Sequence, residues 1–189
     1  MTQELTLELV QKLPKADLHC HLDGSLRPST ILELADNLGV ELPYKDEVSL
    51  KEFLNVGFNC PSLVDYLKRF AITTSVLQDF DGLKRAAYEM AEDASKENVR
   101  YLEVRFSPIL HINHGMTLHD VTEAVLIGLS EAERNFNIKT GLIICALRNQ
   151  PPFNSLRLAE LAVAFKNRGV VGFDLAGDEA NYPAKNHIE

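Results

Sequence analysis

Two histidines separated by one residue are the strongest sign of chemistry in the sequence. His19 and His21 lie in a stretch, Ala16 to Leu22, that predicts a short strand. In a strand, residues i and i+2 point to the same face, so both imidazoles can reach one metal ion, whereas Cys20 points to the other face. Imidazole suits zinc, and iron, nickel or copper are further options. Two histidines at this spacing that only form hydrogen bonds are the alternative interpretation.

The residues that follow the pair favour the metal site. Asp23 and Gly24 come at the predicted end of the strand, and Pro28 then opens a helix, where its missing N–H costs nothing. The helix is predicted to run to Leu38, with Gly39 as its C-terminal stop. A strand that ends in polar residues and leads into a helix is typical of (β/α) barrels, whose chemistry lies at that end of the strands.

Three stretches of the chain resemble the adenosine deaminase family and occur in the family's order. They are residues 15–25, 101–108 and 172–179, which read KADLHCHLDGS, YLEVRFSP and GFDLAGDE. The resemblance spans nearly the whole chain. It implies a metal-dependent hydrolase in which a zinc-activated hydroxide attacks C6 of the purine and ammonia leaves.

The resemblance also implies roles for particular residues. His19 and His21 are expected to bind zinc, and Asp23 is expected to contact the ribose hydroxyls alongside His21. Related adenine deaminases tend to carry glutamate where this chain has Asp23, so aspartate favours a nucleoside over a free base. Gly177 is expected to present its backbone N–H to a purine ring nitrogen, since a side chain there would block the approach. A simple turn glycine is the alternative.

Residues 49–77 are predicted to form a helical insertion over the mouth of the active site. The motif Ser49-Leu-Lys-Glu52 has the pattern of a capping box that opens a short helix. Phe53, Leu54 and Phe58 resemble the family's hydrophobic gate over the purine. Packing in a helix core is the alternative interpretation of these three side chains.

The rest of the chain alternates strands with helices, which predicts parallel strands with right-handed crossovers. Because polar residues close every strand, we expect an α/β fold of the (β/α)8 TIM-barrel family rather than a doubly wound sheet. Asn154 is expected to cap the last helix. The strands are predicted at 99–106, 142–147 and 170–175, and the helices at 28–38, 80–96, 117–136 and 154–168.

The strand at 99–106 carries charged residues on one face, although buried parallel strands are usually apolar throughout. This face predicts a polar cavity or a paired ion network, and we interpret Glu103, Arg105 and Asp174 as a structural polar layer. An edge strand with one solvated face is the alternative. His111 and His114 fall in a predicted loop and are expected to be solvated.

Composition restricts the partners and the compartment. The net charge of −8 is a poor match for nucleic acid or an anionic membrane surface. We expect no signal peptide and no membrane span, because the N-terminus is polar and acidic and no long apolar run occurs. Cys20, Cys60 and Cys145 form no CxxC pair and no disulfide framework, which favours a reducing cytoplasm.

One departure from the family is large. The family's third metal histidine, its metal aspartate and its catalytic glutamate lie on strands beyond the equivalent of Glu189, and His187 does not replace them. We therefore expect residues 1–189 to form the N-terminal half of one barrel domain, with about the first four strands. Alone, this half should bind zinc weakly and have little deaminase activity. Its first and fourth strands should need the C-terminal half, or self-association, to cover them.

The expected function is hydrolytic deamination of adenosine or 2'-deoxyadenosine to the inosine product and ammonia, in purine salvage. Deamination of adenine or another aminopurine is the nearest alternative. A catalytically inactive half-barrel that serves as an assembly or binding module is the alternative of another class. The cytidine-type zinc deaminases combine an HxE with a PCxxC motif, and the chain has no PCxxC.

Overall fold

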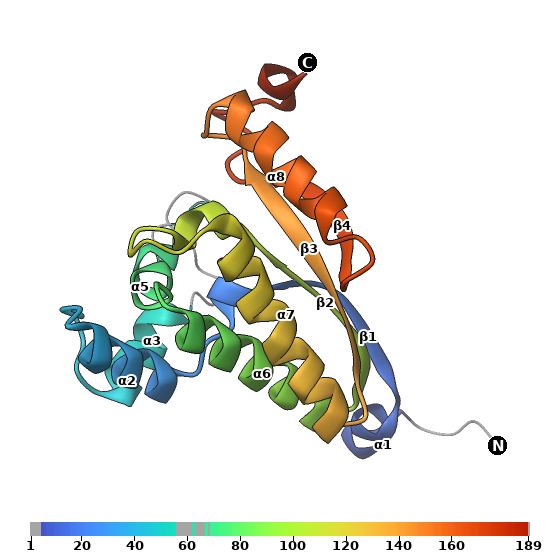
Figure 1. Ribbon diagram of the computed structural model, residues 1–189. Coiled ribbons are helices and arrows are strands. Elements are labelled where there is room, and N and C mark those ends of the chain that lie inside the picture. Colours follow the sequence, from blue (N-terminus) through green and yellow to red (C-terminus); the bar gives the residue numbers. More distant parts are fainter. Residues whose placement is uncertain (1–4, 56–61, 63–66, 68, 189) are drawn as a thin grey trace.

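A computed structural model describes residues 5–55, 62, 67 and 69–188, which fold as a parallel sheet with helices packed on it (Figure 1). The four strands lie in the order β1-β2-β3-β4, and each neighbouring pair is parallel. The alternation of strands and helices predicted from the sequence is confirmed. In chain order the elements are α1 (Leu7–Lys12), β1 (Lys15–His21), η1 (Leu22–Gly24), α2 (Pro28–Leu38), α3 (Glu47–Leu54), α5 (Phe70–Val76), α6 (Phe80–Lys96), β2 (Val99–Phe106), η2 (Pro108–His111), α7 (Leu118–Asn135), β3 (Lys139–Leu147), α8 (Pro152–Ala164), β4 (Val170–Ala176) and η3 (Ala184–His187).

The hydrophobic core lies between the sheet and its helices. Helices α6 and α7 lie side by side, and α8 packs on β3 and β4 (Figure 1). Leu102, Val104 and Phe106 of β2 and Leu142 and Ile144 of β3 are all buried in this core. Burial of one such side chain contributes about 1.5–3 kcal/mol, so these positions hold the strands in register. Within the described residues, every helix is too short or too polar to cross a membrane.

The other face of β2 carries the charged side chains. Arg105 is buried, and its Nη1 donates to Asp174 Oδ2 on β4 at 2.8 Å while its Nη2 donates to Leu18 O on β1 at 3.2 Å. Glu103 accepts a hydrogen bond from the Tyr101 hydroxyl at 3.0 Å. Because β2 lies between β1 and β3, the interpretation of β2 as an edge strand is wrong. The ion pair of Arg105 with Asp174 confirms the predicted paired polar layer.

Local signals set several helix ends as predicted. Pro28 occupies the first turn of α2, and Gly39 ends it with φ +66°, a conformation that glycine adopts at little cost. Thr117 and Asp120 form a capping box at the start of α7, in which each side chain accepts from the backbone N–H of the other.

Two predicted helix starts are wrong. Helix α3 begins earlier than expected, because Asp46 is its cap and accepts from Ser49 N at 2.9 Å. Both residues are good caps three positions apart, so the local pattern alone does not separate them. Helix α8 begins directly after Pro151, which places Asn154 inside its first turn, and it ends at Ala164 rather than at residue 168.

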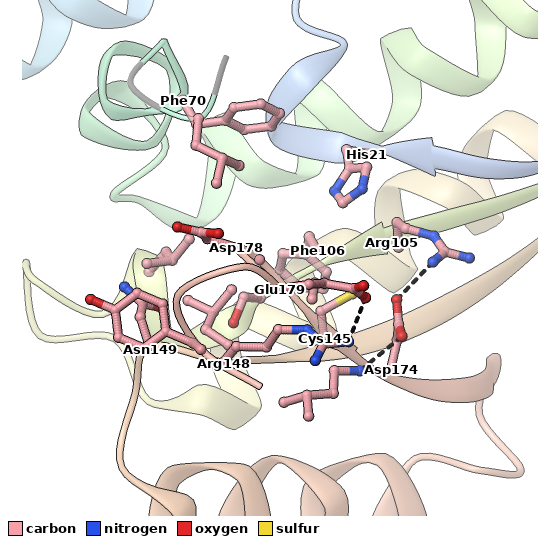
Figure 2. Close-up of a pocket in the computed structure, with 18 of the residues that line it drawn as sticks. His21, Phe70, Arg105, Phe106, Cys145, Arg148, Asn149, Asp174, Asp178 and Glu179 are labelled. Atoms are coloured by element: carbon pink, nitrogen blue, oxygen red, sulfur yellow. Dashed lines mark hydrogen bonds and ion pairs between the residues drawn. The ribbon is translucent and has the colours of Figure 1, made fainter. Parts of the chain in front are cut away.

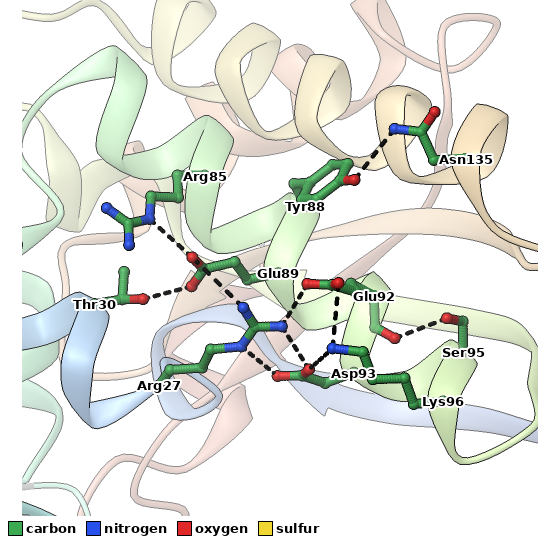
Figure 3. A network of polar contacts seen from close by, with 10 residues as sticks. All are labelled: Arg27, Thr30, Arg85, Tyr88, Glu89, Glu92, Asp93, Ser95, Lys96 and Asn135. Carbon is green, nitrogen blue, oxygen red and sulfur yellow. Dashed lines mark hydrogen bonds and ion pairs between the residues drawn. The ribbon is translucent and has the colours of Figure 1, made fainter. Parts of the chain in front are cut away.

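A cluster of ion pairs fixes the turn after β1 to α6 (Figure 3). Arg27, the last residue before α2, donates from Nε to Asp93 Oδ2 at 2.7 Å and from Nη2 to Glu92 Oε2 at 2.6 Å. Glu89 accepts from the Thr30 hydroxyl at 2.6 Å. Single exposed pairs of this kind contribute little, but a cluster around one guanidinium restrains the segment that joins β1 to α2.

His111 is fully buried, so the expectation that it is a solvated loop residue is wrong. It lies in η2, and its Nδ1 donates to Leu77 O at 2.9 Å, which leaves Nε2 without a partner among the described residues. Nearby, Gln78 accepts from Asn113 N at 3.1 Å. These bonds tie the connection between α5 and α6 to the segment after β2. His114 is exposed, as expected.

We expect His111 to make the fold less stable at acidic pH. Burial lowers the pKa of His111 from 6.5 to about 4, so the folded protein binds this proton less readily than the unfolded chain does. The neutral imidazole therefore contributes its full stabilisation above about pH 6.5. As the pH falls toward 4 this contribution is lost, and the free energy of unfolding decreases by up to about 3 kcal/mol. Urea unfolding at several pH values measures this slope.

His111→Asn is the test variant, because asparagine can still donate to Leu77 O but does not titrate. Its free energy of unfolding should fall less steeply with acid than that of the wild type. His114→Asn, at an exposed position, is the control and should keep the wild-type slope. Parallel curves for the wild type and His111→Asn would contradict the assignment.

Arg105→Met should destabilise the fold by about 2–3 kcal/mol, because Asp174 and Leu18 O lose the donor that they share in a partly buried site. Arg100→Met is the matched control on the same strand. Arg100 is exposed and donates only to Asn137 O at 2.8 Å among the bonds described, so its loss should cost under about 1 kcal/mol. Urea unfolding at neutral pH compares the two variants, and equal costs would refute a central role for Arg105.

Candidate active site

The carboxyl ends of the four strands open into one cleft of about 830 Å³. This volume lies within the range of small-molecule sites. Polar side chains from all four strand ends face the cleft together with apolar ones (Figure 2). The four residues that the resemblance assigned to metal and substrate all line it: His19, His21, Asp23 and Gly177.

The two histidines of β1 lie close together in the cleft. Their ring centroids are 5.5 Å apart, and the rings are inclined at 44°. Burial, with a smaller effect of His19 and Arg105, lowers the pKa of His21, which favours the neutral imidazole that binds metals. Cys20 is not part of this pair, and its Sγ lies 3.6 Å from Ser25 Oγ.

The pair supplies part of a metal site. A catalytic zinc takes about three protein ligands, and the described part of the chain brings together no group of three or more His, Cys, Asp and Glu side chains that could hold a metal. Cys145 also lines the cleft, but burial raises the pKa of its thiol to about 12, so it stays protonated and is a poor ligand. His19 and His21 therefore fit a metal as two nitrogen ligands.

Asp23 lies in the turn η1 at the end of β1 and is only 5% exposed. Its Oδ1 is buried and has no hydrogen-bond partner among the described residues, and burial raises the pKa of this carboxyl to about 6. Ser25 Oγ stabilises the turn by donating to His21 O at 2.7 Å. An unpaired buried carboxyl oxygen is suited to accept a hydrogen bond from a hydroxyl of a bound molecule.

Gly177 follows β4 and has φ +114°, a backbone conformation that favours glycine. Arg148, at the end of β3, lies next to it in the cleft wall. The Arg148 backbone N–H donates to Ala176 O at 2.9 Å, and its Nη2 donates to Glu179 Oε1 at 2.6 Å (Figure 2). The sequence marked the end of β3 as polar, but it did not indicate this pairing with the loop after β4.

The three residues predicted as a hydrophobic gate do not gather at the cleft in the described structure. Phe53 packs with its ring 5.2 Å from that of Tyr44. Leu54 lines a separate cavity of about 70 Å³. Phe58 lies outside the described residues. The gate role of these side chains stays a prediction.

Phe70 forms the apolar wall beside the histidines instead. Its ring meets that of His21 edge-on, with centroids 6.1 Å apart and an interplanar angle of 77° (Figure 2). Leu67, three residues earlier, also lines the cleft. The sequence did not single out Phe70 for the site, although its i, i+3 spacing with Leu67 could have indicated a shared face toward the cleft.

Comparison with known sequences agrees with this geometry. Residues 14–189 match a protein-family model described as adenosine deaminase. A probable adenosine deaminase of Dictyostelium discoideum is 46% identical over 187 residues, which are 99% of this chain and 24% of that protein. An adenosine deaminase of Mycolicibacterium gilvum is 45% identical over 195 residues, covering 100% of this chain and 53% of that protein. The chain thus spans about half the length of the latter relative.

Solved structures of similar fold cover the same region. An adenine deaminase from Arthrobacter aurescens has a TM-score of 0.80 and 28% identity, over 92% of this chain and 52% of that one. A Burkholderia ambifaria amidohydrolase with bound zinc has a TM-score of 0.82 and 26% identity, over 98% and 51%. An Arabidopsis N6-mAMP deaminase has a TM-score of 0.76 and 32% identity, over 94% and 53%.

These neighbours are TIM barrels, and this chain superposes on about half of each. The four parallel strands and their helices therefore form part of a (β/α)8 barrel, with His19 and His21 at the carboxyl end of its first strand. The family model covers all but the first 13 residues of the chain. With that match, the two curated relatives and the barrel architecture, the chain belongs to the adenosine deaminase family.

Proposed function

We propose that the chain supplies the metal-binding strand and part of the substrate site of a hydrolytic deaminase. Its substrate is adenosine or 2'-deoxyadenosine, and the products are the inosine compound and ammonia. The observation that carries the proposal is the meeting of His19, His21, Asp23 and Gly177 in one cleft at the carboxyl ends of the strands.

The metal in this proposal is zinc, with His19 Nε2 or Nδ1 and the corresponding nitrogen of His21 as two of its ligands. Zinc acidifies water and so provides a nucleophile near neutral pH. The chain's own contribution is to hold the two imidazoles side by side and to shield that of His21 with Phe70. We place the remaining ligands and the catalytic acid or base outside residues 1–189.

The substrate side of the proposal depends on Asp23. Its unpaired Oδ1 would accept a hydrogen bond from a ribose hydroxyl, which satisfies a buried polar atom at no cost to the fold. Adenine has no such hydroxyl, and this supports a nucleoside over a free base. Gly177, directly after β4 on the opposite side of the sheet from β1, would present its backbone N–H to the purine ring.

Two alternatives stay open to experiment. Adenine or another aminopurine as the substrate is supported by the likeness to an adenine deaminase and to an N6-mAMP deaminase. A catalytically inactive half-barrel that serves as a binding or assembly module is supported by the open edges of β1 and β4 within the described sheet. Residues 1–189 by themselves are expected to have little deaminase activity in either case.

His19→Ala and His21→Ala should each abolish tight zinc binding by the complete barrel protein that contains this chain, because loss of one ligand leaves too few to hold the ion. Metal content per protein after dialysis, measured by inductively coupled plasma mass spectrometry, reports the effect. His119→Ala, on the exposed surface of α7, is the matched control and should keep full zinc content. Full zinc content in His19→Ala would refute the metal assignment.

Asp23→Ala should reduce kcat/KM for adenosine by about a hundredfold in the same protein, since a buried hydroxyl contact to the carboxylate is lost. Activity toward adenine, where it exists, should change far less. A spectrophotometric panel of adenosine, 2'-deoxyadenosine, adenine and AMP gives both comparisons, with Asp36→Ala on the exposed face of α2 as the control. Preference of the wild type for adenine, with no effect of Asp23→Ala, would favour the base deaminase.

A further inference from the structure

Arg148 contacts the chain on both sides of Gly177. Its backbone N–H donates to the carbonyl of Ala176, the residue before the glycine, at 2.9 Å. Its guanidinium Nη2 donates to Glu179 Oε1, two residues after the glycine, at 2.6 Å. The residue directly after β3 therefore contacts both the entry to and the exit from the turn that Gly177 makes.

Arg148 is itself held rigidly. Its side chain is 13% exposed, whereas that of Glu179 is 74% exposed, so the arginine is the fixed partner of the pair. His187 Nε2 donates to Arg148 O at 3.0 Å, and Ser155 Oγ donates to His187 Nδ1 at 2.9 Å. The chain after β4 thus returns to the start of α8 and fixes the backbone of Arg148 from its other side.

Packing around Gly177 does not by itself determine the glycine's orientation. A Cβ built on Gly177 would meet only Arg148, at 3.8 Å from its N and 3.9 Å from its Cβ, and these are ordinary contacts. With φ at +114° and no crowding neighbour, the glycine has a wide choice of backbone angles. Asp178, the next residue, is held by the bonds that its Oδ1 accepts from Ala180 N and Asn181 N. The two contacts that Arg148 makes join the turn itself to the end of the neighbouring strand β3.

We propose that Arg148, through its ion pair with Glu179, is a positioning residue that keeps the backbone N–H of Gly177 directed at the purine. This inference rests on the proposed function, because it assumes that the purine lies against Gly177. The hydrogen bond of the ion pair is charge-assisted and short, which suits a restraint at the exposed rim of a site. Loss of either partner would remove the side-chain restraint on the turn, while the backbone bond from Arg148 N to Ala176 O stays and no group that touches the reacting atoms is lost.

The test uses the complete barrel protein and a set of deaza-adenosines, each with one ring nitrogen replaced by C–H. The wild type should discriminate against the analogue that lacks the nitrogen bound by Gly177, by about tenfold in kcat/KM. Arg148→Met and Glu179→Gln should turn over adenosine about tenfold less efficiently and should no longer discriminate between it and that analogue. The double variant Arg148→Glu/Glu179→Arg, which restores the pair in reverse, should regain part of the discrimination.

Arg157→Met, at an exposed arginine of α8, is the control and should keep both the efficiency and the discrimination of the wild type. Glu179→Gln alters an exposed side chain, so a folding defect in Arg148→Met would still leave a testable variant. Turnover of adenosine with unchanged discrimination in both variants would overturn the role of Arg148. Absence of adenosine turnover by the wild type would instead overturn the proposed function.

Discussion

The guanidinium of Arg105 joins strands that are not neighbours in the sheet. It starts on β2, binds the carbonyl of Leu18 on β1 and reaches past β3 to Asp174 on β4. Leu18 lies directly before His19, within the stretch of β1 between Asp17 and Cys20 where the pairing with β2 is irregular. Asp174 in turn accepts from the backbone N–H of Leu175 at 2.8 Å, close to Gly177. The spacing between the β1 side and the β4 side of the cleft therefore depends on this one cation.

The turn that carries Asp23 is restrained from two sides. On one side, Arg27 and its carboxylates fix the start of α2 against α6 (Figure 3). On the other, Phe70 lies so close to Gly24 that a Cβ there would come within 3.2 Å of its ring. The bonds of His111 and Gln78 fix the end of α5, the helix that begins at Phe70, to η2. Asp23 is thus held buried by contacts on both sides of its turn, as a site on rigid elements requires.

The electrostatics of the cleft agree with its place in the adenosine deaminase family. Burial favours the neutral forms of His21 and Cys145 and raises the pKa of Asp23 to about 6. Both arginines of the cleft wall, Arg105 and Arg148, are paired with carboxylates. The cleft therefore offers imidazole nitrogens and a hydroxyl acceptor, which is the chemistry that a metal ion and an uncharged nucleoside would use.

The sequence alone determined the features that depend on near neighbours. Alternating side chains identified β2, and the ends of α2 were set by Pro28 and Gly39. The i, i+2 spacing of His19 and His21 placed both side chains on one face of β1. Each of these patterns acts within a few residues. Tertiary structure decided what depends on distant segments. The burial of His111, the pairing of Arg105 with Asp174 and the position of Phe70 beside His21 each require residues that lie 34 or more positions apart to meet. Local periodicity carries no information about which distant side chain will fill a given space, and so these features emerged only from the fold.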